Sequence, residues 1–120
     1  MSYVRECGVP MLLHRKQFEM TEKARKVALL ETVINDFQKM ATDLARQIWA
    51  EEERTKIRDT RHFAYSTFAK AASLRRANLL ASVADLKAKL DAAKRELDEV
   101  TEQLRDLKLN DAPSSIDVAA

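Results

Sequence analysis

The sequence predicts an all-α fold, namely a long two-helix antiparallel coiled-coil hairpin. The 120 residues include one Gly and two Pro, and 33% of them are charged. This composition is typical of long exposed helices and not of a compact enzyme, whose many turns need glycine. Two stripes of apolar residues also repeat with alternating spacings of three and four residues. Paired antiparallel, the two stripes fit one fold-back near residues 61–62.

The first stripe runs from Leu13 to Ile48 and predicts a helix over residues 12–56. Before Val27 the stripe positions include Lys16 and Lys23, whose methylene stems can lie along an apolar surface. A stripe that repeats every ~3.5 residues stays in line only if the helix winds around a partner. The predicted seam residues of this helix are Val27, Leu30, Ile34, Phe37, Leu44 and Ile48.

The second stripe predicts a helix over residues 66–109. Its predicted seam residues are Leu79, Val83, Leu86, Leu90, Leu97, Val100, Leu104 and Leu107. An antiparallel pairing places Leu44 opposite Leu79 and Val27 opposite Leu97, with one register throughout. Because one fold-back satisfies every such pair, the partner of each helix is expected to be the other helix of the same chain.

The predicted hinge, residues 57–65, contains neither Gly nor Pro. A tight turn, a short extended loop and a partly helical bend therefore all remain open. The candidate helix caps around it are Asp59, Thr60, Ser66 and Thr67.

Both ends of the chain are expected to lie outside the coiled coil. Residues 1–11 contain Gly8 and Pro10 and predict a flexible arm, with Met1 and Met11 as alternative starts. Residues 110–120 predict a disordered tail, because poor helix formers and Pro113 end the second helix. The final Ala-Ala pair is a weak hypothesis for a signal read by bacterial energy-dependent proteases.

No pattern predicts catalytic, cofactor-binding or metal-binding residues. His14 and His62 lie far apart in a hairpin, Cys7 is the only thiol, and there is no glycine-rich phosphate loop. The consecutive acids Glu51–Glu53 point in different directions on a helix, so we interpret them as a solvated face and not as a metal site. The chain also lacks a run of about 18 apolar residues. We expect a cytoplasmic protein that is neither an enzyme nor inserted in a membrane and that has no small-molecule substrate.

The hinge region is basic and aromatic. From Arg54 to Arg76 the sequence has seven basic residues and one acid, a local charge of +6. Two interpretations remain open: the aromatic residues cluster to close the turn, or they are anchors within a basic field that docks on an acidic partner. The predicted docking residues are Trp49, Arg58, Arg61, His62, Phe63, Tyr65, Phe68, Arg75 and Arg76.

Two strings carry a family resemblance. The first runs from Leu12 to Val27 and begins LLHRKQF; the second is HFAYSTFAKAA, from His62 to Ala72. Over roughly residues 12–108 the chain resembles the alphaproteobacterial branch of the FliJ family of flagellar export proteins. It departs from that pattern in its N-terminal arm, in Thr60 and Ser66 where hinge prolines are expected, and in its Ala-Ala tail.

The resemblance implies a coiled-coil stalk that serves the flagellar type III export apparatus, and hence flagellum biogenesis, motility and chemotaxis. The end that bears the termini, around Leu13–Leu30 and Leu90–Leu107, would enter the hexameric export ATPase. The hinge would face the export-gate membrane protein, and export chaperones are further candidate partners. The protein would act in the cytoplasm, at the base of the export apparatus and peripheral to the membrane.

Two other functions fit the pattern without the resemblance. Between Asp91 and Asp106, near the end that bears the termini, acidic residues outnumber basic ones. A generic coiled-coil adaptor or scaffold would join one partner at this acid-rich end and another at the basic tip. Nucleic-acid binding through the tip is the less favoured alternative, because the net charge of the chain is only +2. We therefore expect no nucleic-acid partner.

Overall fold

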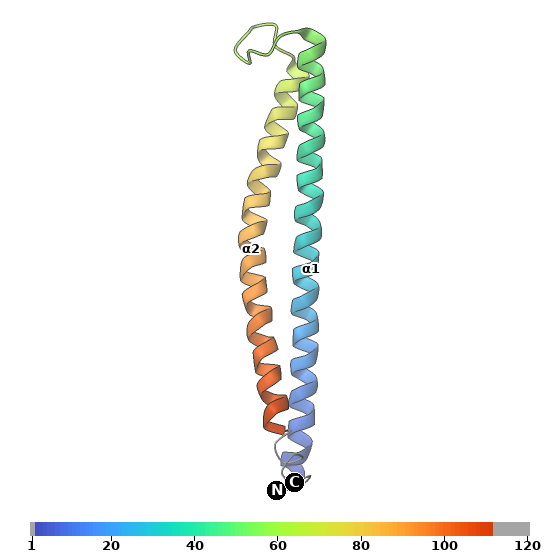
Figure 1. Ribbon diagram of the computed structural model, residues 1–120, viewed down its shortest axis with the longest axis vertical. Coiled ribbons are helices and arrows are strands. Elements are labelled where there is room, and N and C mark those ends of the chain that lie inside the picture. The colour runs from blue at the N-terminus through green and yellow to red at the C-terminus, as the bar shows by residue number, and fades with distance from the viewer. Residues whose placement is uncertain (1, 112–120) are drawn as a thin grey trace. The chain divides into compact units, whose positions relative to one another are not determined.

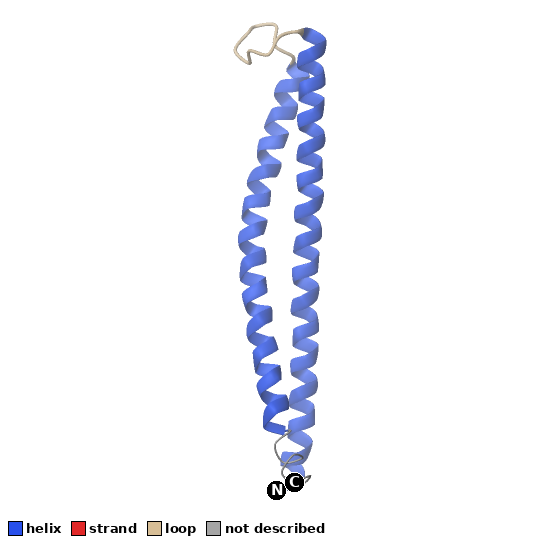
Figure 2. Ribbon diagram, in the orientation of Figure 1, coloured by secondary structure: helices blue, strands red, loops and turns tan. Residues whose placement is uncertain are grey.

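The computed structural model describes residues 2–111, with side chains described from residue 10 to residue 110. This part of the chain contains two helices, α1 (Ser2–Thr55) and α2 (Thr67–Asp111), and no strand (Figures 1 and 2). The predicted all-α fold with two long helices is confirmed.

The chain divides into two units, and each takes one segment from either helix. Among the described residues, the terminal unit combines 2–29 with 90–111, and the hinge unit comprises 30–89. The two units are described separately below.

In the hinge unit, the α1 and α2 segments run antiparallel. One groove brings Phe37 and Met40 of α1 beside Ser82 of α2, and a neighbouring groove brings Gln47 of α1 beside Arg75 of α2. As the residue number increases along α1, the number of the neighbouring residue on α2 decreases, as a hairpin requires. The buried apolar side chains of this unit are Ile34, Ala41, Leu44, Tyr65, Ala69, Ala72 and Val83.

In the terminal unit, polar contacts show the same direction of pairing. Lys16 Nζ donates to Gln103 Oε1 at 2.6 Å, and Lys23 Nζ donates to Glu96 Oε2 at 3.2 Å. The partner of Lys23 therefore precedes the partner of Lys16 on α2 by as many residues as separate the two lysines on α1, so the two segments run antiparallel. Both lysines are half-buried, beside a core of Val27, Ala93, Val100 and Leu104.

The predicted seam residues all lie in buried or half-buried positions. The buried ones are Val27, Ile34, Leu44, Val83, Val100 and Leu104. The half-buried ones are Leu30, Phe37, Ile48, Leu79, Leu86, Leu90, Leu97 and Leu107. Because two helices cover only one side of each other, many seam side chains keep one edge in water.

The helix boundaries differ most from the prediction at the N-terminus. We expected a flexible arm over residues 1–11, whereas α1 begins at Ser2 and contains Pro10. Proline has a φ that fits a helix, and what it lacks is one N–H donor, so helical backbone can continue on both sides of it. At the other end the predicted tail over residues 110–120 begins too early, because α2 includes Asn110 and Asp111. The rest of that tail, residues 112–120, lies outside the described residues.

The buried seam predicts a stability difference between two leucines of the hinge unit. Leu44 is 8% exposed and Leu74 is 64% exposed. Leu44→Ala should lower the free energy of unfolding by about 2–4 kcal/mol, because it leaves a cavity between the helices. Leu74→Ala should change it by no more than about 0.5 kcal/mol. Urea unfolding followed by far-ultraviolet circular dichroism measures both, and equal losses would contradict the assigned core.

In the terminal unit, replacing a seam lysine by an apolar residue should raise the stability of the fold. Lys23→Leu should raise the free energy of unfolding by roughly 1 kcal/mol, because a polar residue at a seam position costs stability. Lys26, which is exposed on the same helix, provides the control variant Lys26→Leu. The same unfolding experiment applies, and a loss of stability in Lys23→Leu would show that the Glu96 ion pair outweighs the apolar gain.

Candidate functional site

The hinge loop begins with a lysine in a conformation that usually requires glycine. Lys56 has φ 61°, in the left-handed region, and its N–H donates to the carbonyl of Glu52 at 2.8 Å. A residue in this conformation directly after the last turn commonly ends a helix. Because Lys carries a Cβ, the conformation costs roughly 1–2 kcal/mol. Contacts elsewhere in the hinge must offset that cost.

The loop (Figure 2, tan) closes through two short turns. His62 N–H donates to the carbonyl of Asp59 at 3.0 Å, and Tyr65 N–H donates to the carbonyl of His62 at 3.0 Å. The ring nitrogen His62 Nδ1 accepts from the N–H of Ala64, also at 3.0 Å. Ser66 then caps α2, because its Oγ accepts from the N–H of Ala69 at 3.1 Å. The loop is thus held by its own backbone without Gly or Pro.

Two glutamates at the end of α1 hold the start of α2. Tyr65 Oη donates to Glu52 Oε2 at 2.8 Å, and Ser66 Oγ donates to Glu51 Oε1 at 2.9 Å. Arg54 donates to the same Glu51 carboxylate at 2.5 and 3.2 Å. We call these five residues, Glu51, Glu52, Arg54, Tyr65 and Ser66, the hinge clasp. It joins the two helices at the point where the chain reverses.

The clasp shifts three ionisation equilibria, one of which is that of Arg54, because the hydrogen bond to Glu51 raises the pKa of Arg54. The hydrogen bonds from Arg54 and Ser66 lower the pKa of Glu51. The hydrogen bond to Glu52, followed by burial, raises the pKa of Tyr65. The clasp therefore favours an ionised Glu51 and a neutral Tyr65, the two states in which its hydrogen bonds form.

The three consecutive glutamates also neutralise part of the basic tip. Arg54 pairs with Glu51, Lys56 with Glu53 at 3.3 Å, and Arg58 with Glu53. The interpretation of Glu51–Glu53 as a solvated face is therefore wrong, because all three are half-buried and form ion pairs. The other basic residues between Arg54 and Arg76 form no ion pair within the described part of the chain. They are Arg61, Lys70, Arg75 and Arg76.

The predicted docking aromatics separate into two groups. Tyr65 is 8% exposed and belongs to the clasp, as the turn-closing interpretation expects. Trp49, Phe63 and Phe68 are exposed, and the Phe63 ring stacks on the His62 ring at a centroid distance of 4.7 Å. The docking interpretation remains a prediction for these three residues. The predicted basic residues Arg58, Arg61, Arg75 and Arg76 are also exposed.

The clasp glutamates are the residues that the sequence analysis missed. Glu51 and Glu52 follow Ile48 at spacings of three and four, so they continue the seam towards the hinge. A carboxylate at a half-buried seam position needs hydrogen-bond donors. Tyr65 and Ser66 supply these donors from the other side of the fold-back. Hydroxyl donors opposite seam carboxylates are therefore the sequence feature that could have predicted the clasp.

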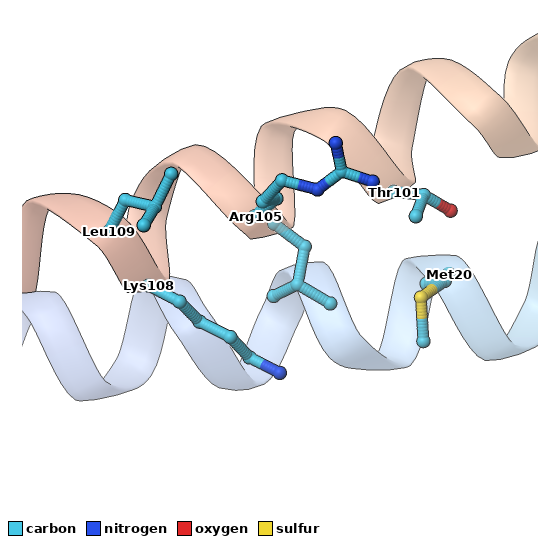
Figure 3. A pocket seen from close by; sticks show the side chains of 6 residues that line it. Met20, Thr101, Arg105, Lys108 and Leu109 are labelled. Atoms are coloured by element: carbon cyan, nitrogen blue, oxygen red, sulfur yellow. The ribbon is translucent and has the colours of Figure 1, made fainter. Parts of the chain in front are cut away.

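Grooves lie along the paired helices in both units. One groove of about 490 Å³ in the terminal unit is lined by Met20 of α1 and by Thr101, Leu104, Arg105, Lys108 and Leu109 of α2. Figure 3 shows this lining from close by. Within residues 2–111 neither helix has a stretch apolar enough to cross a membrane. No three potential metal ligands gather among the described side chains.

Neither a family model nor a curated protein nor a solved structure matches this chain. The geometry of the hinge therefore provides the evidence for a site.

The clasp predicts a pH dependence that Tyr65→Phe should remove. Folding raises the phenol pKa above its ordinary value of 10.0. The hydrogen bond therefore stabilises the fold fully below that value and is lost as pH rises through the higher pKa of the folded state. Tyr65→Phe should cost about 1 kcal/mol at neutral pH. Between neutral and strongly alkaline pH the variant should lose less stability than the wild type.

Urea unfolding at a series of pH values measures both effects. Tyr3 is present in both proteins, so its titration cancels in the comparison. Parallel curves for the two proteins above about pH 10 would contradict the assigned bond.

Proposed function

We propose that the chain is a non-enzymatic stalk and escort of a flagellar type III export apparatus, which couples the export ATPase ring to the export gate. The proposal is supported by the position, in the structure, of the more specific of the two sequence strings that resemble the family. The string His62–Ala72 begins in the hinge loop and continues into α2, and it includes the exposed Phe63 and the buried Tyr65. The same stretch thus contains an exposed aromatic and a clasp residue that holds the loop.

The chemistry of the hinge supports a docking role. Phe63 is exposed on a loop that its own hydrogen bonds order, so little conformational entropy is lost when a partner covers it. Arg61 next to it forms no ion pair within the described residues and favours an acidic partner surface. Aromatic and arginine side chains of this kind are the usual anchors of protein interfaces.

The proposal assigns the two ends of the coiled coil to different partners. The hinge faces the export-gate membrane protein, and the segments around Leu13–Leu30 and Leu90–Leu107 enter the export ATPase hexamer. The protein acts in the cytoplasm at the base of the apparatus, and export chaperones are further partners. A generic adaptor with a basic docking tip remains the alternative.

Capture experiments with a hinge variant test this assignment. Arg61→Ala combined with Phe63→Ala should keep capture of the export ATPase but reduce capture of the export gate at least tenfold, as loss of an anchor residue does. The matched control is Leu80→Ala combined with Lys87→Ala, which removes one exposed apolar and one exposed basic side chain from α2. The control should capture both partners, and circular dichroism should show unchanged helicity in both variants.

A deletion strain provides the decisive outcome. Deletion of the gene should abolish swimming and flagellin export, and the wild-type gene should restore both. A deletion strain that swims and exports flagellin normally would exclude the proposed function. Capture of neither partner by the wild-type protein would favour the generic adaptor.

A further inference from the structure

The closed end of the hinge unit exposes large apolar side chains from three different parts of the chain. Phe63 in the loop is 96% exposed, Trp49 of α1 is 60% exposed, and Phe68 of α2 is 55% exposed. Exposed aromatics of this size gathered at one end usually mark an interaction surface. They come from the loop and from both helices, so the exposed apolar surface of this end is not confined to one segment of the chain.

The unpaired cations are distributed in the same way. On α2, Lys70 and Arg75 are separated by about 140° around the helix axis, and Arg76 lies a further 100° or so beyond Arg75. These three side chains therefore point in three directions, and Arg61 adds a fourth charge from the loop. None of the four forms an ion pair within the described residues. Such a ring of charge favours a partner that is approached along the axis of the hairpin.

Phe63 in the loop is almost fully exposed. The grooves beside Met40 and Leu79 are lined by residues between 37 and 47 and between 75 and 82, so they do not include Phe63. A protein partner would have to supply the whole socket for this ring and also meet charges that point in several directions. An anionic bilayer surface requires neither, because it is soft and carries negative charge in every lateral direction.

We propose that the closed end of the hinge unit binds an anionic lipid surface peripherally, with Phe63 in the interface and Arg61 and Lys70 among the headgroups. The neutralisation of Arg54, Lys56 and Arg58 by the glutamates leaves the remaining cations to select acidic lipids. This inference rests on the hinge geometry alone, and a lipid surface would compete with a protein partner for Arg61 and Phe63.

The positions of the charges set how strong the binding can be. Lys70 lies near the start of α2, whereas Arg75 and Arg76 lie roughly 8–9 Å further along the helix at ~1.5 Å per residue. This is close to the Debye length of roughly 10 Å at an ionic strength of 0.1 M, so the contribution of the two arginines falls as salt is added. We therefore expect reversible binding that weakens steeply as salt is added.

Vesicle binding by the purified full-length chain tests the proposal. The probes are vesicles of phosphatidylglycerol and phosphatidylcholine in equal parts, and vesicles of phosphatidylcholine alone. Sedimentation at about 0.01 M ionic strength should recover the wild type only with the acidic vesicles, and about 1 M salt should release it. Phe63→Ala should weaken the partition about tenfold, because one aromatic ring no longer enters the interface. The matched control Phe18→Ala removes an exposed phenylalanine of the terminal unit and should bind like the wild type.

Tryptophan fluorescence locates the inserted side chain. Trp49 is the only tryptophan of the chain, so Trp49→Phe combined with Phe63→Trp moves the single fluorophore to the loop. With acidic vesicles its emission should shift to the blue and resist quenching by iodide more than that of Trp49 in the wild type. Circular dichroism should show that all variants remain helical.

Three outcomes would overturn the proposal. Absence of binding to acidic vesicles at low salt would leave the loop to a protein partner. Equal binding to neutral vesicles would exclude selection by charge. Full binding by a helical Phe63→Ala protein would exclude insertion of that ring. Because these assays contain no flagellar component, their failure is distinguishable from failure of the proposed export function.

Discussion

The hydrogen bonds from Tyr65 and Ser66 to Glu52 and Glu51 are the interaction on which the hairpin depends. A chain that reverses direction without Gly or Pro has no residue that makes the reversal easy, and Lys56 even adopts a left-handed conformation. The clasp offsets this cost with charge-assisted hydrogen bonds at half-buried positions, which are stronger than bonds between neutral groups. Each of these bonds links the end of α1 to the start of α2, so the reversal and the helix pairing stabilise each other.

The clasp also decides which charges are available for binding. Counted from the sequence, the segment from Arg54 to Arg76 carries a charge of +6. The structure sets the preceding glutamates against Arg54, Lys56 and Arg58, so the charge without an ion-pair partner resides mainly on Arg61 and the start of α2. The charge counted over the segment from Arg54 to Arg76 overstates its basic character, because the glutamates just before the segment form ion pairs with three of its basic residues.

The sequence predicts the helices and the fold-back better than it predicts the hinge. Alternating spacings of three and four identify positions that are buried or half-buried in both units, because helix pairing depends on a periodic pattern. The loop between Thr55 and Thr67 contains the predicted fold-back near residues 61–62. The clasp has no periodic signature, since it depends on side-chain geometry between residues 13 and 15 positions apart. The start of α1 at Ser2 was missed because Pro10 was interpreted as the end of an arm, although proline removes only one helical hydrogen bond.

The seam changes its chemistry towards the hinge, and this change makes the clasp possible. Ala69 and Ala72 occupy buried positions at the start of α2, and Ala69 has no exposed surface. The separation of packed helices depends on the side chains at their contact, so alanines allow a closer approach than leucines do. We expect such an approach here, where the short side chain of Ser66 donates to Glu51 at 2.9 Å. A leucine seam up to the hinge would gain apolar burial but hold the helices too far apart for that bond. The alanines thus bury less apolar surface than leucines would, but they permit a polar contact that fixes where the chain turns. Phe63, in the loop beyond this contact, stays exposed.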